Sequence, residues 1–321
     1  EAKLLLNFLD HWDSERLSPD VLTGWNTRFF DIPYLVNRIN RVLGDDMMKK
    51  MSPWRMVSQK QIRVMKKTVM AYELTGIQQM DYLDLFKKFA YTYGQLDNYR
   101  LDTVAHVVLG ENKLSYDEYT TLAGLYENDF QKFIDYNIKD VELVDRLEDK
   151  MRLIEQAMTI AYDAKVNFGD VFTQVRMWDT LIHNYLLEKQ VVIPPKDAKS
   201  KDSKYEGAYV KDPQRGLHNW VMSFDLNSLY PHLIMQYNIS PDTFVEGEYQ
   251  EVSVDNIIDG QVEAPEEMCL TANGFYYDKS KQGFLPEMME LMYNERKLYK
   301  KKMLEAQAEL EEINKQLKEL T

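Results

Sequence analysis

The stretch Ser223-Phe-Asp-Leu-Asn-Ser-Leu-Tyr-Pro-His-Leu-Ile234 carries the densest pattern in the chain. Residues 220–224 are mostly apolar and lead to Asp225, which predicts a buried strand that ends on a carboxylate. Pro231 then opens an apolar run over 232–237, and proline is favoured in a first helical turn. A carboxylate followed by exposed backbone N–H groups suits Mg²⁺ that carries a phosphate. The alternative is that Asp225 only caps the turn that follows it.

Composition sets broad limits on the chain. Its 321 residues are enough for about two domains, and 45% hydrophobic residues are enough for sizeable cores. The sequence has no apolar run of membrane-spanning length and no secretory signal pattern. Cys269 is the only cysteine, which excludes an intrachain disulfide and fits a reducing, cytoplasmic setting. The five scattered histidines do not suggest zinc.

The net charge of −13 is unusual for a nucleic-acid-binding protein, because phosphate affinity comes mainly from Lys and Arg. Two interpretations stay open. Acidic surface surrounds a local basic groove, or this chain binds DNA poorly by itself.

Hydrophobic periodicity predicts mostly helices before residue 190. The predicted helices are 1–17 (with Leu4, Leu5, Phe8, Leu9 and Trp12 on one face), 31–43 ended by Gly44, 82–89, 101–109, 129–152, 155–163 and 173–189. A short strand is predicted at 21–24, and β-structure within 60–82. The polar, Pro-led segment 194–204 predicts an exposed linker. Short strands and turns are predicted over 205–286, then one long charged helix with a narrow apolar stripe over 287–320.

Two further acidic positions stand out upstream. Asp31 follows the first predicted strand and begins a helix, where Asp is most often a simple cap. Tyr136 and Asp140 are four residues apart and therefore lie on one helix face, close enough to act on one substrate. The alternative for this pair is an ordinary exposed Asp beside a half-buried Tyr.

The pattern D-x-x-S-L-Y-P, with Asp225 at its start, resembles motif A of the family B DNA polymerases. The resemblance implies that Asp225 binds both catalytic metals (Mg²⁺ or Mn²⁺), and that Tyr230 packs under the deoxyribose. It also implies triphosphate contacts from the backbone at Leu226, Ser228, Leu229 and Tyr230. Asn227 and His232 depart from the commonest pattern, and neither is a metal position.

The patterns N-x-x-x-F-D (Asn26, Phe30, Asp31) and Y-x-x-x-D (Tyr136, Asp140) resemble two motifs of the DnaQ-like 3′–5′ proofreading exonuclease that precedes the polymerase domain in this family. The resemblance implies that Asp31 and Asp140 hold metal and that Tyr136 orients the attacking water. Asn26 and Phe30 would contact the frayed primer end. The first motif, D-x-E on a strand, is not found, since Asp13-Ser-Glu15 fits a solvated turn better. Asp31 and Asp140 alone are therefore half of a metal site.

Two shorter matches support the same resemblance. Tyr205-Glu-Gly-Ala208 resembles the Y-x-G-[GA] segment, which implies template contacts from Tyr205, Gly207 and Ala208. Arg296 and Lys300 are four residues apart on the long helix, and the resemblance implies that they bind the incoming triphosphate. The alternative for this second pair is a solvated basic turn.

The resemblance covers nearly the whole chain and is closest to the T-even-type phage replicative branch. It implies an α/β fold: a partial RNase H-like exonuclease domain lacking its first strands (1–190), a linker (191–204), the start of a polymerase palm (205–286) and the first fingers helix (287–321). Missing first strands would leave a sheet edge open. The family motifs D-T-D and K-x-x-x-N-S-x-Y-G do not occur.

The chain is therefore expected to be a fragment or split subunit of a replicative DNA polymerase with proofreading, inactive in polymerisation alone. The implied partners are primer–template DNA, deoxynucleoside triphosphates, a polypeptide carrying the missing motifs, and a sliding clamp with other replication proteins. No membrane partner is expected. The alternatives are a stand-alone nuclease and a non-catalytic, partner-docking remnant.

Overall fold

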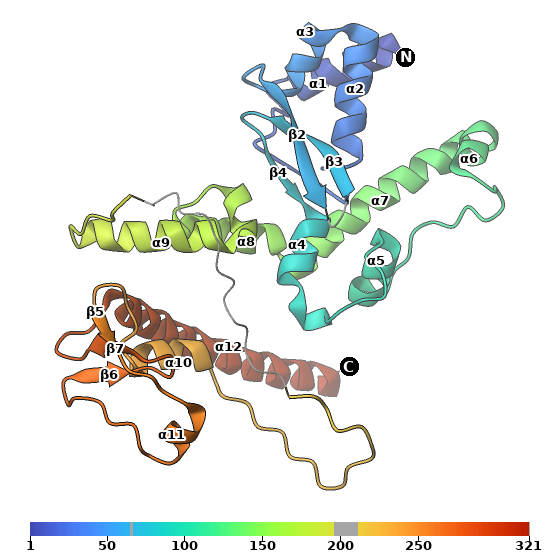
Figure 1. Ribbon diagram of the computed structural model, residues 1–321. Coiled ribbons are helices and arrows are strands. Elements are labelled where there is room, and N and C mark those ends of the chain that lie inside the picture. Colours follow the sequence, from blue (N-terminus) through green and yellow to red (C-terminus); the bar gives the residue numbers. More distant parts are fainter. Residues whose placement is uncertain (65–66, 196–210, 321) are drawn as a thin grey trace. The chain divides into compact units, whose positions relative to one another are not determined.

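The computed structural model describes residues 1–64, 67–195 and 211–320 (Figure 1). The chain divides into two compact units, Glu1–Ser203 and Lys204–Thr321. In the described residues, no helix is both long and apolar enough to span a membrane.

The first unit begins with a small α/β layer. Its elements are α1 (Ala2–Trp12), β1 (Val21–Gly24), α2 (Asp31–Leu43), α3 (Asp45–Met48), the 3₁₀ turn η1 (Lys49–Met51), β2 (Val57–Val64), β3 (Lys67–Leu74) and β4 (Gln78–Asp81). β1 pairs with β4 in parallel, and β2 forms an antiparallel hairpin with β3. Apolar residues of α1 and α2 are buried together with Leu74 and Ile77, which fixes the start of α2 beside the β1 end.

Helices make up the rest of the first unit. They are α4 (Tyr82–Phe89), η2 (Tyr91–Tyr93), α5 (Leu101–Leu109), α6 (Leu122–Asn128), α7 (Phe130–Met151), α8 (Leu153–Ala164), η3 (Phe168–Phe172) and α9 (Gln174–Glu188). A second core forms where α4, α5, α7 and α8 meet, with Tyr82, Leu85, Val104, Leu143 and Leu147 among its buried members. This core buries Leu143, Val144 and Leu147 of α7.

The second unit combines a small sheet with two packed helices. Its elements are α10 (Leu229–Gln236), β5 (Phe244–Tyr249), α11 (Val254–Ile258), β6 (Met268–Leu270), β7 (Phe275–Asp278) and α12 (Phe284–Leu320). The sheet is antiparallel with strand order β5-β7-β6. In Figure 1, α10 lies along the N-terminal part of α12, and the T-shaped contact between the His232 and Tyr293 rings, 4.8 Å apart, joins them.

Most predicted helices are confirmed within a few residues, and so is the α/β class. The first helix is the exception at its end: it stops at Trp12 rather than at residue 17. Leu4 was predicted on its apolar face, but it is 71% exposed. The helix contributes Leu5, Leu9 and Trp12 to the core, with Phe8 packed beside them, and the polar residues that follow Trp12 have no core contact that would favour a longer helix.

The predicted buried strand before Asp225 is wrong. Residues 217–226 form no helix or strand, and Trp220 and Phe224 are 100% and 86% exposed. A strand needs backbone partners, and the β5-β7-β6 sheet does not include this segment. The helix predicted after it is confirmed as α10, with Pro231 in its first turn.

The expected open sheet edge agrees with the pairing of β1 and β4. Within the described part of the chain, each of these strands pairs only with the other. One edge of each therefore carries backbone groups that no strand satisfies.

Candidate nuclease and nucleotide sites

Four of the residues singled out from the sequence line one cavity in the first unit. The cavity has a volume of about 1010 Å³, and its lining includes Asn26, Asp31, Tyr136 and Asp140. They come from the β1–α2 connection, the first turn of α2, and one face of α7. Residues separated by more than 100 positions in the sequence are thus brought to one solvent-filled space.

Asp81 fixes the connection between β1 and α2. Its carboxylate accepts hydrogen bonds from the backbone N–H groups of Asn26 (2.9 Å), Arg28 (3.0 Å) and Leu83 (3.0 Å). It is 4% exposed, and burial raises its pKa although the three N–H groups favour the charged form. Asn26 has a left-handed φ of 63°, which asparagine tolerates better than most residues. Asp81 therefore holds the loop that presents Asn26 to the cavity.

Asp31 is the first residue of α2, where the helix dipole favours a negative charge. Although the residue as a whole is exposed, the protein around its carboxyl partly removes water and raises its pKa. Such a carboxyl gains from a cation placed beside it.

Lys113 occupies the space between Tyr136 and Asp140. Its Nζ lies 2.6 Å from Asp140 Oδ2 and 3.3 Å from the Tyr136 hydroxyl, and 5.2 Å from the centre of the tyrosine ring. Burial by itself lowers the pKa of Lys113, but the hydrogen bonds and charge of Asp140 outweigh it, so the pKa lies above its usual value. The loop that carries Lys113 is held by its own N–H, which donates to Asp102 Oδ1 at 2.8 Å.

The carboxylates of this cavity are suitable ligands for Mg²⁺ or Mn²⁺. Asp140 Oδ1 is buried and has no hydrogen-bond partner among the described residues, so it is available to a ligand. No group of three or more His, Cys, Asp or Glu residues that could hold a metal occurs in the described ranges. Mg²⁺ is commonly bound by one or two carboxylates together with water and substrate phosphates. Asp31 and Asp140 therefore offer part of a metal site, as expected from the motifs.

Other predicted residues lie elsewhere. Phe30 is 68% exposed and is not part of the cavity lining. Tyr205, Gly207 and Ala208 fall outside the described residues.

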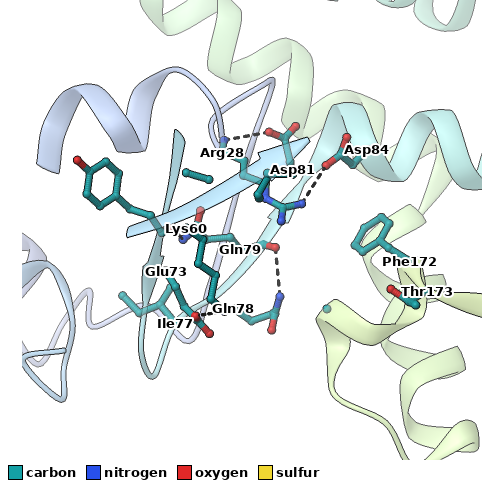
Figure 2. Close-up of a pocket in the computed structure, with 14 residues that line it drawn as sticks. Arg28, Lys60, Glu73, Ile77, Gln78, Gln79, Asp81, Asp84, Phe172 and Thr173 are labelled. Carbon is teal, nitrogen blue, oxygen red and sulfur yellow. Dashed lines mark hydrogen bonds and ion pairs between the residues drawn. The ribbon is translucent and has the colours of Figure 1, made fainter. Parts of the chain in front are cut away.

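A second, smaller cavity of about 270 Å³ adjoins the same loop (Figure 2). Arg28 and Asp81 contribute to it, and the Arg28 guanidinium lies 3.8 Å from the Asp84 carboxylate. The 24–28 loop thus has the large cavity on one side and a polar pocket of charged and amide side chains on the other.

In the second unit, the predicted nucleotide residues lie around the start of α10. Asp225 is exposed, Tyr230 is 72% exposed, and Ser228 has a left-handed φ of 53° as the residue before the helix. Arg296 Nη1 donates to Ser228 Oγ at 3.4 Å, so α12 brings its arginine to the turn after Asp225. Lys300, one turn further along α12, is exposed.

Comparison with known proteins covers nearly the whole length of the chain. The family description DNA polymerase family B, exonuclease domain, matches residues 1–104, and DNA polymerase family B matches residues 170–318. The chain belongs to DNA polymerase family B. The family predicted from the motifs is thereby confirmed.

Named relatives fit this family. The chain is 36% identical over 316 residues to the DNA-directed DNA polymerase of Enterobacteria phage T4, covering 98% of this chain and 34% of that protein. It is also 36% identical over 318 residues to that of Escherichia phage RB69, again covering 34% of the relative. A DNA polymerase delta catalytic subunit from Drosophila melanogaster is 29% identical over 311 residues. This family B chain spans about a third of the length of its phage relatives.

Two residues that shape the large cavity, Asp81 and Lys113, were not predicted from the sequence. Asp81 had a detectable signal, because it directly precedes the predicted helix at 82–89 and caps it. No sequence signal indicated its longer-range hydrogen bonds with the backbone N–H groups of Asn26 and Arg28. Lys113 lies in a loop without periodicity, and only the fold shows that it reaches Asp140.

Proposed function

We propose that this chain supplies the proofreading exonuclease region and the beginning of the polymerase domain of a replicative DNA polymerase. The observation that carries the proposal is the convergence of Asn26, Asp31, Tyr136 and Asp140 on one cavity. Its substrates are primer–template DNA and deoxynucleoside triphosphates, and its partner is a polypeptide that carries the remaining polymerase motifs.

In the first unit, the proposed reaction is removal of a nucleotide from a DNA 3′ end. Divalent metal bound there would activate water and stabilise the leaving oxygen. Asp31 and Asp140 would hold that metal, and the Tyr136 hydroxyl would orient the attacking water. Asn26, fixed by Asp81, contacts the 3′-terminal nucleotide. Lys113 must release Asp140 Oδ2 for that oxygen to become a metal ligand, because its ammonium group lies 2.6 Å away.

In the second unit, Asp225 is the proposed metal carboxylate of the nucleotide site. Leu226, Ser228 and Leu229 offer backbone contacts to the triphosphate, and Tyr230 packs under the sugar. Arg296, already at the Ser228 hydroxyl, and Lys300 supply positive charge for the phosphates.

Metal binding in the presence of DNA tests the first site. Free Mn²⁺ is measured by electron paramagnetic resonance as the chain is titrated together with a short single-stranded oligonucleotide. Asp31→Ala and Asp140→Ala each weaken Mn²⁺ binding at least tenfold. The control Asp135→Ala, an exposed carboxylate on the same helix as Asp140, leaves it unchanged. Equal binding by all four proteins would contradict the proposed site.

Activity assays on the chain alone separate the alternatives. No primer extension is expected, because Asp225 is exposed and no described residue completes a metal cluster around it. Incorporation that Asp225→Ala abolishes would refute the fragment interpretation. Mg²⁺-dependent digestion of single-stranded DNA that Asp31→Ala abolishes would favour a stand-alone nuclease. A chain that binds neither DNA nor Mn²⁺ would favour a non-catalytic remnant.

A further inference from the structure

Ser228 has a backbone conformation that its own side chain disfavours. It precedes α10 with φ 53° and ψ 46°, the left-handed region that residues other than glycine enter at a cost. Such a conformation persists only where neighbouring groups fix it. Ser228 lies in the turn after Asp225, which is proposed to contact the triphosphate. The groups that fix Ser228 therefore bear on the nucleotide site.

His232 is one of those groups. Its backbone N–H and its ring Nδ1 both contact the Ser228 carbonyl oxygen, at 3.1 Å and 2.9 Å. Because a carbonyl oxygen can only accept a hydrogen bond, Nδ1 carries the ring proton, and Nε2 of the neutral ring carries none. The ring is held in turn by α12, through the T-shaped contact with Tyr293 at 4.8 Å between ring centres.

Ser228 is also held from α12 directly. Arg296 follows Tyr293 by three residues, so the two side chains lie on one face of this helix. The Arg296 guanidinium donates to the Ser228 hydroxyl oxygen at 3.4 Å. Since α10 and α12 pack against each other (Figure 1), both contacts come from the same interface. The turn after Asp225 is thus fixed at its carbonyl by His232 and at its hydroxyl by Arg296.

The Ser228 carbonyl belongs to the same peptide group as the Leu229 N–H. In a planar trans peptide these two groups point in opposite directions. The carbonyl points into α10, where it accepts from His232, so the Leu229 N–H points away from the start of the helix. Since Pro231 has no N–H, Leu229 and Tyr230 are the residues of α10 whose N–H groups have no acceptor within the helix. A side chain that fixes this peptide therefore fixes the direction of one of these two donors.

We propose that His232 is a positioning residue of the nucleotide site: by holding the Ser228 carbonyl, it presents the Leu229 N–H to a phosphate group of the incoming deoxynucleoside triphosphate. This role rests on the nucleotide site proposed above for the second unit. Backbone N–H groups at the start of a helix are effective phosphate ligands. His232 does not contact the triphosphate in this arrangement, and it acts through the peptide between Ser228 and Leu229.

Two variants separate this role from simple stabilisation of α10. His232→Phe keeps an aromatic ring beside Tyr293 but has no hydrogen-bond donor, and the exposed position tolerates the change. His232→Ser loses the ring but keeps a donor, because a serine hydroxyl in a helix can bond the carbonyl four residues back. If His232 acts through the Ser228 carbonyl, the phenylalanine variant loses its function and the serine variant regains it.

The peptide between Ser228 and Leu229 can be observed by itself. These two residues form the only Ser-Leu pair in the sequence, so ¹³C-carbonyl serine combined with ¹⁵N-leucine gives a single carbonyl–amide correlation in the nuclear magnetic resonance spectrum. We expect His232→Phe to shift the carbonyl frequency of this peak, and His232→Ser to return it toward the wild-type position. The control His218→Phe makes the same substitution at a histidine that also contacts a carbonyl four residues back, that of Gln214, and leaves the peak in place.

Titration of the full chain with dATP and Mg²⁺ measures the functional effect on the same peak. The wild-type peak should move as the nucleotide binds. The dissociation constant should rise about threefold to tenfold in His232→Phe, the range expected for the loss of one neutral hydrogen bond, and should stay near the wild-type value in His232→Ser and His218→Phe. The other leucine N–H peaks verify that each variant remains folded.

The possible failures are distinguishable. A wild-type peak that does not respond to dATP refutes the nucleotide site itself, and the role of His232 with it. A wild-type peak that responds, with equal affinity in His232→Phe, refutes only the role of His232. Weakened binding that His232→Ser does not restore overturns the positioning role in favour of a structural one. A neutral His232 ring that carries its proton on Nε2, as read from ¹⁵N-histidine spectra, also overturns it.

Discussion

Replacement of Asp81 tests whether one buried carboxylate supports the β1–α2 loop. Asp81→Ala removes the acceptor of three backbone N–H groups, those of Asn26, Arg28 and Leu83. Hydrogen bonds to a charged group contribute about 1.5–3 kcal/mol each, which gives a simple sum of about 5–9 kcal/mol. Burial of the carboxylate offsets part of this sum, as its raised pKa indicates. The expected loss is about 3–5 kcal/mol of the free energy of unfolding of the first unit.

Asp81→Asn should fall between the wild type and Asp81→Ala. The amide oxygen still accepts from Asn26 and Leu83, whereas the new NH₂ group meets the Arg28 N–H, and two donors cannot pair. We expect a loss of about 1–3 kcal/mol. Asp81→Ala should also lose the metal and DNA binding proposed for the large cavity, since Asn26 is no longer held, whereas Asp81→Asn, which keeps the Asn26 bond, should lose less of it.

Urea denaturation followed by far-ultraviolet circular dichroism measures these losses. Asp84→Ala is the matched control: it removes a carboxylate from α4, the helix that Asp81 caps, but one that is partly exposed and 3.8 Å from Arg28. A pair of this kind contributes about 0–1 kcal/mol. If Asp81→Ala and Asp84→Ala destabilise the unit equally, Asp81 does not hold the loop and the reasoning fails.

Three further outcomes follow from contacts in the two units. Lys113→Met removes the cation that lies beside Asp140, so Mn²⁺ binding without DNA tightens severalfold in electron paramagnetic resonance titrations; unchanged binding means that Lys113 does not compete with metal. The raised pKa of Asp31 means that the folded chain binds this proton more tightly than the unfolded chain, whose carboxyl titrates near about 3.9. Wild-type stability should therefore fall relative to Asp31→Asn as pH rises from 3 to 7 in metal-free urea unfolding, and parallel pH curves would count against it. Asn238→Ala loses side-chain bonds to the Asp278 and Lys281 carbonyls and from the Gly283 N–H, so the second unit loses about 2–4 kcal/mol, whereas Asn294→Ala on exposed α12 loses little.

Local signals predict the elements of this chain well. α2 spans the predicted residues 31–43, because an acid at its start and Gly44 after its end act over a few residues. The sequence left open whether the long helix runs on or restarts after residue 152. The helix restarts there, because Arg152 has a left-handed φ of 51° and separates α7 from α8. Asn26, Asp31, Tyr136 and Asp140 could be proposed from the sequence because their motifs lie on such locally determined elements.

Long-range contacts account for the residues that the sequence did not predict. Lys113 is 27 positions from Asp140, and Asp81 is 55 positions from Asn26. Hydrophobic periodicity predicts neither contact, because it indicates only which side of an element is buried. The roles of these two side chains follow from where α5, α7 and β4 are packed, and only the folded structure supplies that.

The segment before Asp225 shows that an apolar sequence pattern does not form a strand when no other strand pairs with it. Residues 220–224 have the apolar character of a buried strand, yet Trp220 and Phe224 are almost fully exposed. Catalytic groups need positioning within about 0.5 Å, and a loop carboxylate without paired neighbours does not have it. Asp31 differs, because α2 is anchored by Ile32, Val36 and Ile39 in a buried core. The two proposed sites are therefore unequal: Asp31 lies on a helix anchored in a core, whereas Asp225 would require strand pairing around residues 220–225 before it could hold metal.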